Sequence, residues 1–103
     1  MLADITSSFV EAYKSIGFDD STALKMAVSN LKSAARLIEK YGDAKSAADK
    51  ATSKGGVTRR GRDIMETSGV KSGIIRGVAE AEARCVELST LVNGKSGVSL
   101  RKA

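Results

Sequence analysis

Residues 20–41 read DSTALKMAVSNLKSAARLIEKY, and this stretch decides the fold class. Asp19, Asp20 and Ser21 offer side-chain acceptors to the first turn of a helix, and Gly42 ends the pattern. The apolar side chains recur at steps of three and four residues, so they lie on one face of a helix. These residues are Leu24, Ala27, Val28, Leu31, Ala34, Ala35 and Ile38. The stretch therefore predicts an amphipathic helix over about residues 20–41.

On the N-terminal side, residues 3–16 carry a second stripe with the same spacing, formed by Ile5, Phe9, Ala12, Tyr13 and Ile16. Gly17 follows it, at a position suited to a left-handed C-terminal residue. No stretch of the chain shows the strict alternation expected of a strand.

On the C-terminal side we predict three more helices, over about 43–52, 58–67 and 70–92. Asp43 would be the N-cap of the helix over 43–52, and Thr58 would be the N-cap of the helix over 58–67. Gly69 would end that second helix. The expected fold is all-α with about five helices. We expect one helical domain over 1–92 and a flexible basic tail over 93–103.

Composition narrows the class of protein. The 103 residues allow one domain, and an apolar fraction of 42% with only 4% aromatic residues leaves a core built from Ala, Val, Ile and Leu. Such a core favours oligomerisation, because one protomer has few large side chains to close it. With no His and one Cys, the chain has no Ser-His-Asp triad, no structural zinc site and no intrachain disulfide. No secretory signal is recognised, so we expect a cytoplasmic protein.

The stretch 70–92 carries two overlapping patterns. Ile74, Val78, Ala81, Cys85 and Leu88 follow a near-heptad spacing, and Cys85 is expected to act there as a small buried hydrophobe. Small residues recur every four positions, at Gly69, Gly73, Gly77 and Ala81. Interior glycines each cost about 1 kcal/mol of helix stability relative to Ala. The pattern indicates either close packing against another helix or a locally weak helix.

Nucleotide-binding motifs are absent. The segment from Gly56 to Asp63 has the glycine spacing of a phosphate loop, but Arg62 stands where the motif needs Lys. No G-x-G-x-x-G fingerprint occurs, so we expect this chain alone to bind no nicotinamide cofactor.

A basic cluster follows the middle of the chain, at Lys54, Arg59, Arg60 and Arg62, within a net charge of +5. It is compatible with a solvated edge, with contact to an anionic ligand, or with nucleic acid. No aromatic residue lies among these cations to stack on bases, and no trustworthy helix-turn-helix spacing is present.

The loop from Ser53 to Thr58 is the most informative segment. Gly55 and Gly56 can take positive φ and turn consecutive N–H groups toward one point, where the N-terminus of the next helix adds positive potential. A carboxylate or phosphate would fit there between two hydroxyls. A plain inter-helix turn is the alternative.

The order of these features resembles the C-terminal domain of the pyrroline-5-carboxylate reductases over about residues 2–92. The resemblance is carried by Ala51-Thr-Ser-Lys-Gly-Gly-Val-Thr58, Gly61, Met65-Glu66-Thr-Ser-Gly69-Val70, Ala79-Glu-Ala81, Arg84 and Glu87-Leu88-Ser89. It implies an interleaved helical homodimer, like the C-terminal domains of 6-phosphogluconate-dehydrogenase-type reductases, with higher assembly open.

The resemblance also implies a function. Enzymes of this family reduce an imine substrate to proline with NAD(P)H, which their N-terminal domain holds. By position, the substrate carboxylate would bind Ser53, Gly55, Gly56, Val57 and Thr58, largely through backbone N–H groups. Thr58 would also hydrogen-bond the ring nitrogen and assist its protonation. Without a dinucleotide-binding half, this portion would be inactive alone.

Besides the missing dinucleotide-binding half, which is the most important departure from the family pattern, two others stand out. Lys54 replaces the usual Pro of the loop, and three arginines follow it. The alternative function is therefore a standalone helical scaffold or a nucleic-acid-binding module that uses the basic loop 54–62.

Overall fold

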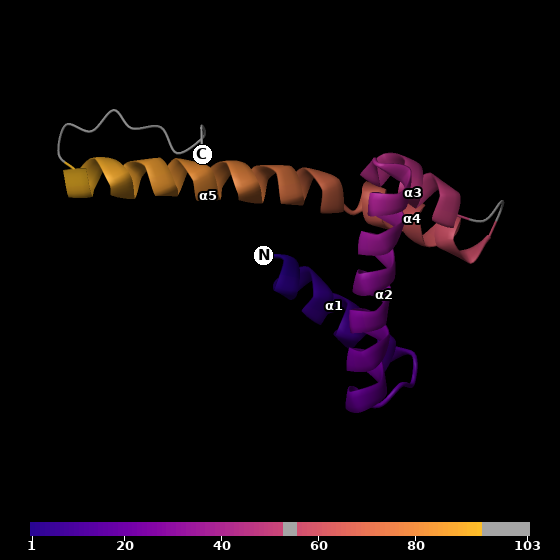
Figure 1. Cartoon of the computed structure of the whole chain (residues 1–103). Helices are drawn as coiled ribbons and strands as arrows, with labels where there is room; N and C mark the ends of the chain where they lie inside the picture. The colour runs from indigo at the N-terminus through magenta and orange to yellow at the C-terminus, as the bar shows by residue number, and fades with distance from the viewer. Residues whose placement is uncertain (53–55, 94–103) are drawn as a thin grey trace. The chain divides into compact units, whose positions relative to one another are not determined.

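The computed structural model describes residues 1–52 and 56–93. These contain five α-helices and no strand: α1 (Leu2–Ser15), α2 (Asp20–Tyr41), α3 (Ala44–Ala51), α4 (Val57–Thr67) and α5 (Val70–Asn93) (Figure 1). The predicted all-α class and the five helices are confirmed. The expected flexible tail falls, from residue 94 on, outside the described residues.

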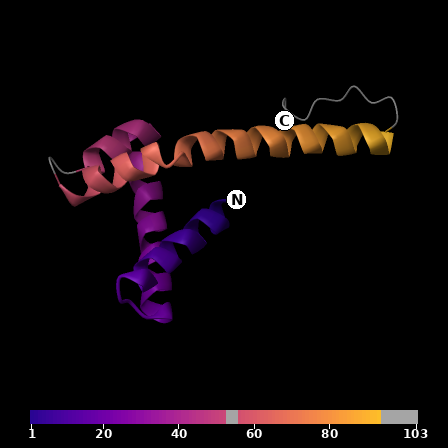
Figure 2. The same ribbon diagram turned by 180° about the vertical axis from the view of Figure 1, so that it is seen from behind.

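The chain divides into two compact units, Met1–Ser53 and Lys54–Ala103. In the first unit, α1 and α2 lie side by side near the turn that joins them and diverge toward Met1 (Figures 1 and 2). Ala23 and Ala27 of α2 are only 0% and 4% exposed. Their small side chains let the helix backbones approach closely.

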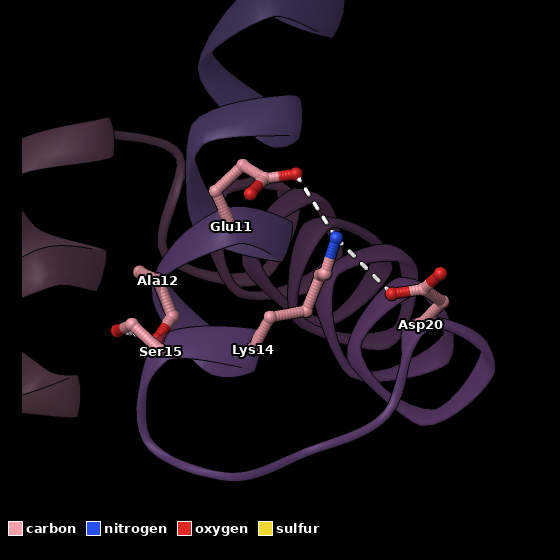
Figure 3. A network of polar contacts seen from close by, with 5 residues as sticks. All are labelled: Glu11, Ala12, Lys14, Ser15 and Asp20. Atoms are coloured by element: carbon pink, nitrogen blue, oxygen red, sulfur yellow. Dashed lines mark hydrogen bonds and ion pairs between the residues drawn. The ribbon is translucent and has the colours of Figure 1, made fainter.

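Polar contacts join α1 and α2 at two places. Within the pair, the Asn30 side-chain amide donates to the Tyr13 hydroxyl at 2.6 Å. At the turn, Lys14 Nζ lies 3.1 Å from an Asp20 oxygen and 3.4 Å from a Glu11 oxygen (Figure 3). The hydrogen bond to Asp20, followed by the charge of that carboxylate and of Glu11, raises the pKa of Lys14 above its ordinary value.

The helix ends follow their sequence signals. Asp19 accepts a hydrogen bond from the Thr22 N–H at 2.8 Å, and Asp43 accepts from the Ser46 N–H at 3.0 Å, so both act as N-caps. Gly42 adopts φ +72° at the end of α2, in the left-handed region that favours glycine. These acidic caps and the glycine stop were predicted and are confirmed.

The second unit contains α4 and α5, which meet at Gly69 with φ +86°. A hollow of about 350 Å³ lies beside this bend. Its apolar lining comes from Met65, Val70, Ile74 and Ile75, while Arg62, Glu66 and Lys71 contribute charged groups.

Burial is limited to small side chains. Among the described residues, the buried apolar positions are Ala23, Ala27 and Ala47, and no large side chain is fully buried. Leu24 and Val78 remain 53% and 52% exposed. The described helices include none that is both long and apolar enough to cross a membrane. Each unit, taken by itself, therefore leaves most of its large apolar side chains exposed.

Replacing Gly42 by Ala tests the left-handed end of α2. A Cβ at this position would meet no atom within 4 Å, so the cost is backbone strain alone. We expect Gly42→Ala to lower the free energy of unfolding by about 1 kcal/mol. Urea unfolding followed by circular dichroism measures the change. Gly61→Ala is the matched control, because Gly61 also has open space but lies inside α4, where Ala stabilises by up to about 1 kcal/mol. Equal effects of the two variants would contradict the strain argument.

The N-caps predict acid sensitivity. Hydrogen bonds from Thr22 lower the pKa of Asp19, and those from Ser46, its hydroxyl first, lower the pKa of Asp43. Carboxyls with a lowered folded-state pKa stabilise the fold above their ordinary value of 3.8, and this stabilisation is lost as pH falls through the lower folded value. We expect the melting temperature to fall in this acid range.

Substitution by asparagine isolates this effect. Asn also caps helices but carries no titratable group, so the double variant Asp19→Asn, Asp43→Asn should lose less of its melting temperature on acidification than the parent chain. Parallel melting curves of the two proteins at neutral and acid pH make the comparison. An identical acid response would show that other groups dominate.

Candidate functional site

The segment that leads into α4 begins at the end of α3. Thr52 follows α3 in an extended conformation, with φ −87° and ψ 117°. Its N–H donates to the Asp49 carbonyl at 3.2 Å, and its hydroxyl donates to the Ala48 carbonyl at 2.7 Å. These bonds tie Thr52 to the last turn of α3.

The helix α4 begins without a side-chain cap. Gly56 is its N-cap, with φ −93° and ψ −175°, and makes no side-chain cap hydrogen bond. The Gly56 carbonyl accepts from the Arg60 N–H at 3.3 Å, which closes the first helical turn. The N–H groups at the start of any α-helix have no acceptor within the helix. The start of α4 therefore presents donors at the positive end of a helix dipole.

One expectation for this turn is corrected. Thr58 was predicted as the N-cap, but the helix starts at Val57 and Thr58 lies in its first turn. Gly56, for which the sequence left positive φ open, is extended, as N-cap residues usually are. Gly is an acceptable N-cap, so the helix begins earlier than the hydroxyl suggested.

Charge around the start of α4 is strongly basic. Its first turn holds no acidic residue, whereas Arg59 and Arg60 are exposed there and Arg62 follows. Cations near a helix N-terminus are disfavoured, by about 0.3–1 kcal/mol each at exposed positions. An anion bound at this end would relieve that repulsion and accept hydrogen bonds from the first N–H groups. The arrangement suits a carboxylate or a phosphate.

Some of the predicted site residues belong to the described part of the chain and some do not. Gly56, Val57 and Thr58 are consecutive at the start of α4, where Val57 is 91% exposed. Ser53 and Gly55, like Lys54 beside them, lie outside the described residues. Only Gly56, Val57 and Thr58 of the predicted carboxylate site thus belong to the described residues.

The structure adds a groove that sequence reasoning missed. It measures about 250 Å³, lies between α1 and α2, and holds the Tyr13–Asn30 hydrogen bond on its lining. Leu2, Ile5 and Phe9 line it from α1. The apolar stripes of both helices were visible in the sequence, but the pairing of Tyr13 with Asn30 across 17 residues had no local signal.

The described part of the chain holds no cluster of metal ligands. No group of three or more His, Cys, Asp or Glu side chains gathers there that could hold an ion.

Comparison with known proteins identifies one family. The model of the family described as pyrroline-5-carboxylate reductase dimerisation matches residues 1–88 of the 103-residue chain. Neither a curated protein nor a solved structure matches the chain.

Proposed function

Because the chain belongs to the pyrroline-5-carboxylate reductase dimerisation family, we propose that it is the homodimeric, substrate-carboxylate-binding part of an NAD(P)H-dependent reductase of proline biosynthesis. The family match over residues 1–88 is the observation that carries this proposal. The reductase would act in the cytoplasm. NAD(P)H supplies the hydride in the complete enzyme, and this sequence contains no dinucleotide-binding fingerprint of its own. The chain alone is therefore proposed to be inactive.

The homodimer is supported by the shortage of buried apolar surface. Only alanines are buried among the apolar side chains of the described residues, while Leu24 and Val78 are about half exposed. Exposed apolar area costs roughly 25 cal/mol per Å² relative to burial. A second protomer would cover such surface, and the dimerisation description of the family agrees with this requirement.

The carboxylate-binding role is supported by the start of α4. In this proposal the N–H groups of Val57 and Thr58 donate to the substrate carboxylate at the uncapped end of the helix. The Thr58 hydroxyl hydrogen-bonds the ring nitrogen and assists its protonation. Ser53, Gly55 and Gly56 complete the loop around the carboxylate, and Lys54 adds positive charge beside it.

The basic residues favour one other function. The alternative is a standalone helical scaffold or a nucleic-acid-binding module that uses the basic loop 54–62. Arg59 and Arg60 favour it, because they are exposed beside a helix start that has no acidic residue. Salt-dependent DNA binding with Kd tighter than about 10⁻⁶ M would favour this alternative, because non-specific binding is usually weaker.

The assembly state tests the homodimer. Light scattering at micromolar concentration should return about twice the protomer mass of 10.8 kDa. A mass of one protomer, with the helices intact by circular dichroism, would refute the proposed homodimer.

The Thr58 hydroxyl tests the site. Calorimetric titration with proline, as a probe that carries the same ring and carboxylate, should show affinity reduced about tenfold or more in Thr58→Val, because a hydrogen bond to a charged group contributes about 1.5–3 kcal/mol. Thr58→Ser is the matched control, since it keeps the hydroxyl at an exposed position. Equal affinity of the valine variant and the parent chain would remove the Thr58 hydroxyl from the site.

A further inference from the structure

Two exposed helical stripes share one spacing. On α2 the stripe consists of Leu24, Val28, Leu31, Ala35 and Ile38. On α5 it consists of Ile74, Val78, Ala81, Cys85 and Leu88. Both follow steps of four, three, four and three residues, the heptad pattern of helices that pack by knobs into holes. Every member of both stripes is exposed within its own unit.

Each border of the α2 stripe has its own chemistry. On one border, Ala27 and Ala34 adjoin α1 and help line the groove between the two helices. The opposite border is basic, with Lys25 and Lys32 one heptad apart and Arg36 beyond them. The 18 residues from Ser21 to Ile38 include these three cations and no acid. The stripe therefore lies between a small-residue border and a positive border.

The α5 stripe has matching borders. Gly73 and Gly77 adjoin it on one side, and a Cβ built on either glycine would meet no atom within 4 Å. Contacts inside this unit thus give no reason for glycine at these two positions, where it is costly in a helix. Glu82 adjoins the stripe on the other side. Over residues 79–93, Glu80, Glu82 and Glu87 outnumber Arg84, so this half of the helix is acidic.

We propose that the α2 stripe of one protomer packs antiparallel against the α5 stripe of a second copy of the chain. This inference rests on the proposed homodimer. Antiparallel helices bring equivalent borders together, so Gly77 faces the small-residue border of α2 while Glu82 faces Lys25 and Lys32. Parallel packing would instead put Arg84 beside the lysines. Two-fold symmetry repeats the contact, with α5 of the first protomer on α2 of the second.

Cross-linking between two distinguishable chains tests this pairing. One chain carries Val28→Cys and Cys85→Ser; the other keeps Cys85, the single native cysteine, and has a longer tag. Antiparallel overlap of the stripes brings position 28 of one protomer within about one turn, roughly 6 Å along the helix axis, of Cys85 in the other. After mixing and subunit exchange, a short bis-maleimide should join the two chains.

The matched control places the new thiol on the opposite side of α2. Ser33 is exposed and lies away from the stripe, so Ser33→Cys with Cys85→Ser should give at most a tenth of the mixed product. Cross-linking confined to Cys85 with Cys85, or to position 28 with position 28, would overturn the pairing. A dimer by light scattering without mixed product overturns this inference alone, whereas a monomer also overturns the proposed homodimer.

Charge reversal supplies an independent measurement. Lys32→Glu should raise the dimer Kd up to about fivefold, the effect of an exposed ion pair, and adding Glu82→Lys to the same chain should restore it, because two-fold symmetry reverses every pair. Analytical ultracentrifugation at low ionic strength measures both. Further weakening in the double variant would contradict the antiparallel orientation.

Discussion

The close contact of α1 with α2 is the constraint on which the first unit depends. Ala23 and Ala27 make that contact possible because their side chains end at Cβ. Because these side chains are small, the contact buries little apolar surface. Larger side chains such as Leu31 lie beside this contact and line the groove between the helices. Leu31 is 41% exposed there. Alanine between α1 and α2 therefore permits close approach while burying little apolar surface.

Much of the fold followed from local chemistry in the sequence. Helix positions were predictable because apolar spacing, acidic caps at Asp19 and Asp43, and glycine stops act within a few residues of each other. The start of α4 was misjudged because two neighbouring residues, Gly56 and Thr58, are both acceptable caps. The Tyr13–Asn30 bond was not predictable, since the distance along the chain hides which polar groups α1 and α2 bring together.

For the candidate site, only the start of α4 can be compared with the sequence, and its role in binding an anion stays a prediction. Adjacent glycines before a helix, followed by arginines, indicated an anion site. The described residues place Gly56, Val57 and Thr58 at an uncapped helix start with exposed basic residues. A sequence pattern states which groups are available, whereas binding geometry depends on the φ and ψ of a few loop residues. Gly56 illustrates this, because its conformation is extended although glycine permits the left-handed one.

If the proposed homodimer covers the exposed stripes of α2 and α5, folding becomes coupled to the abundance of the protein. When a chain buries its apolar surface only against another copy, mass action makes its free energy of unfolding a function of protein concentration. A dilute chain then spends longer with Leu24 and Val78 in water, where proteases and chaperones recognise such surface. For this protein, the level of synthesis would itself become a determinant of stability.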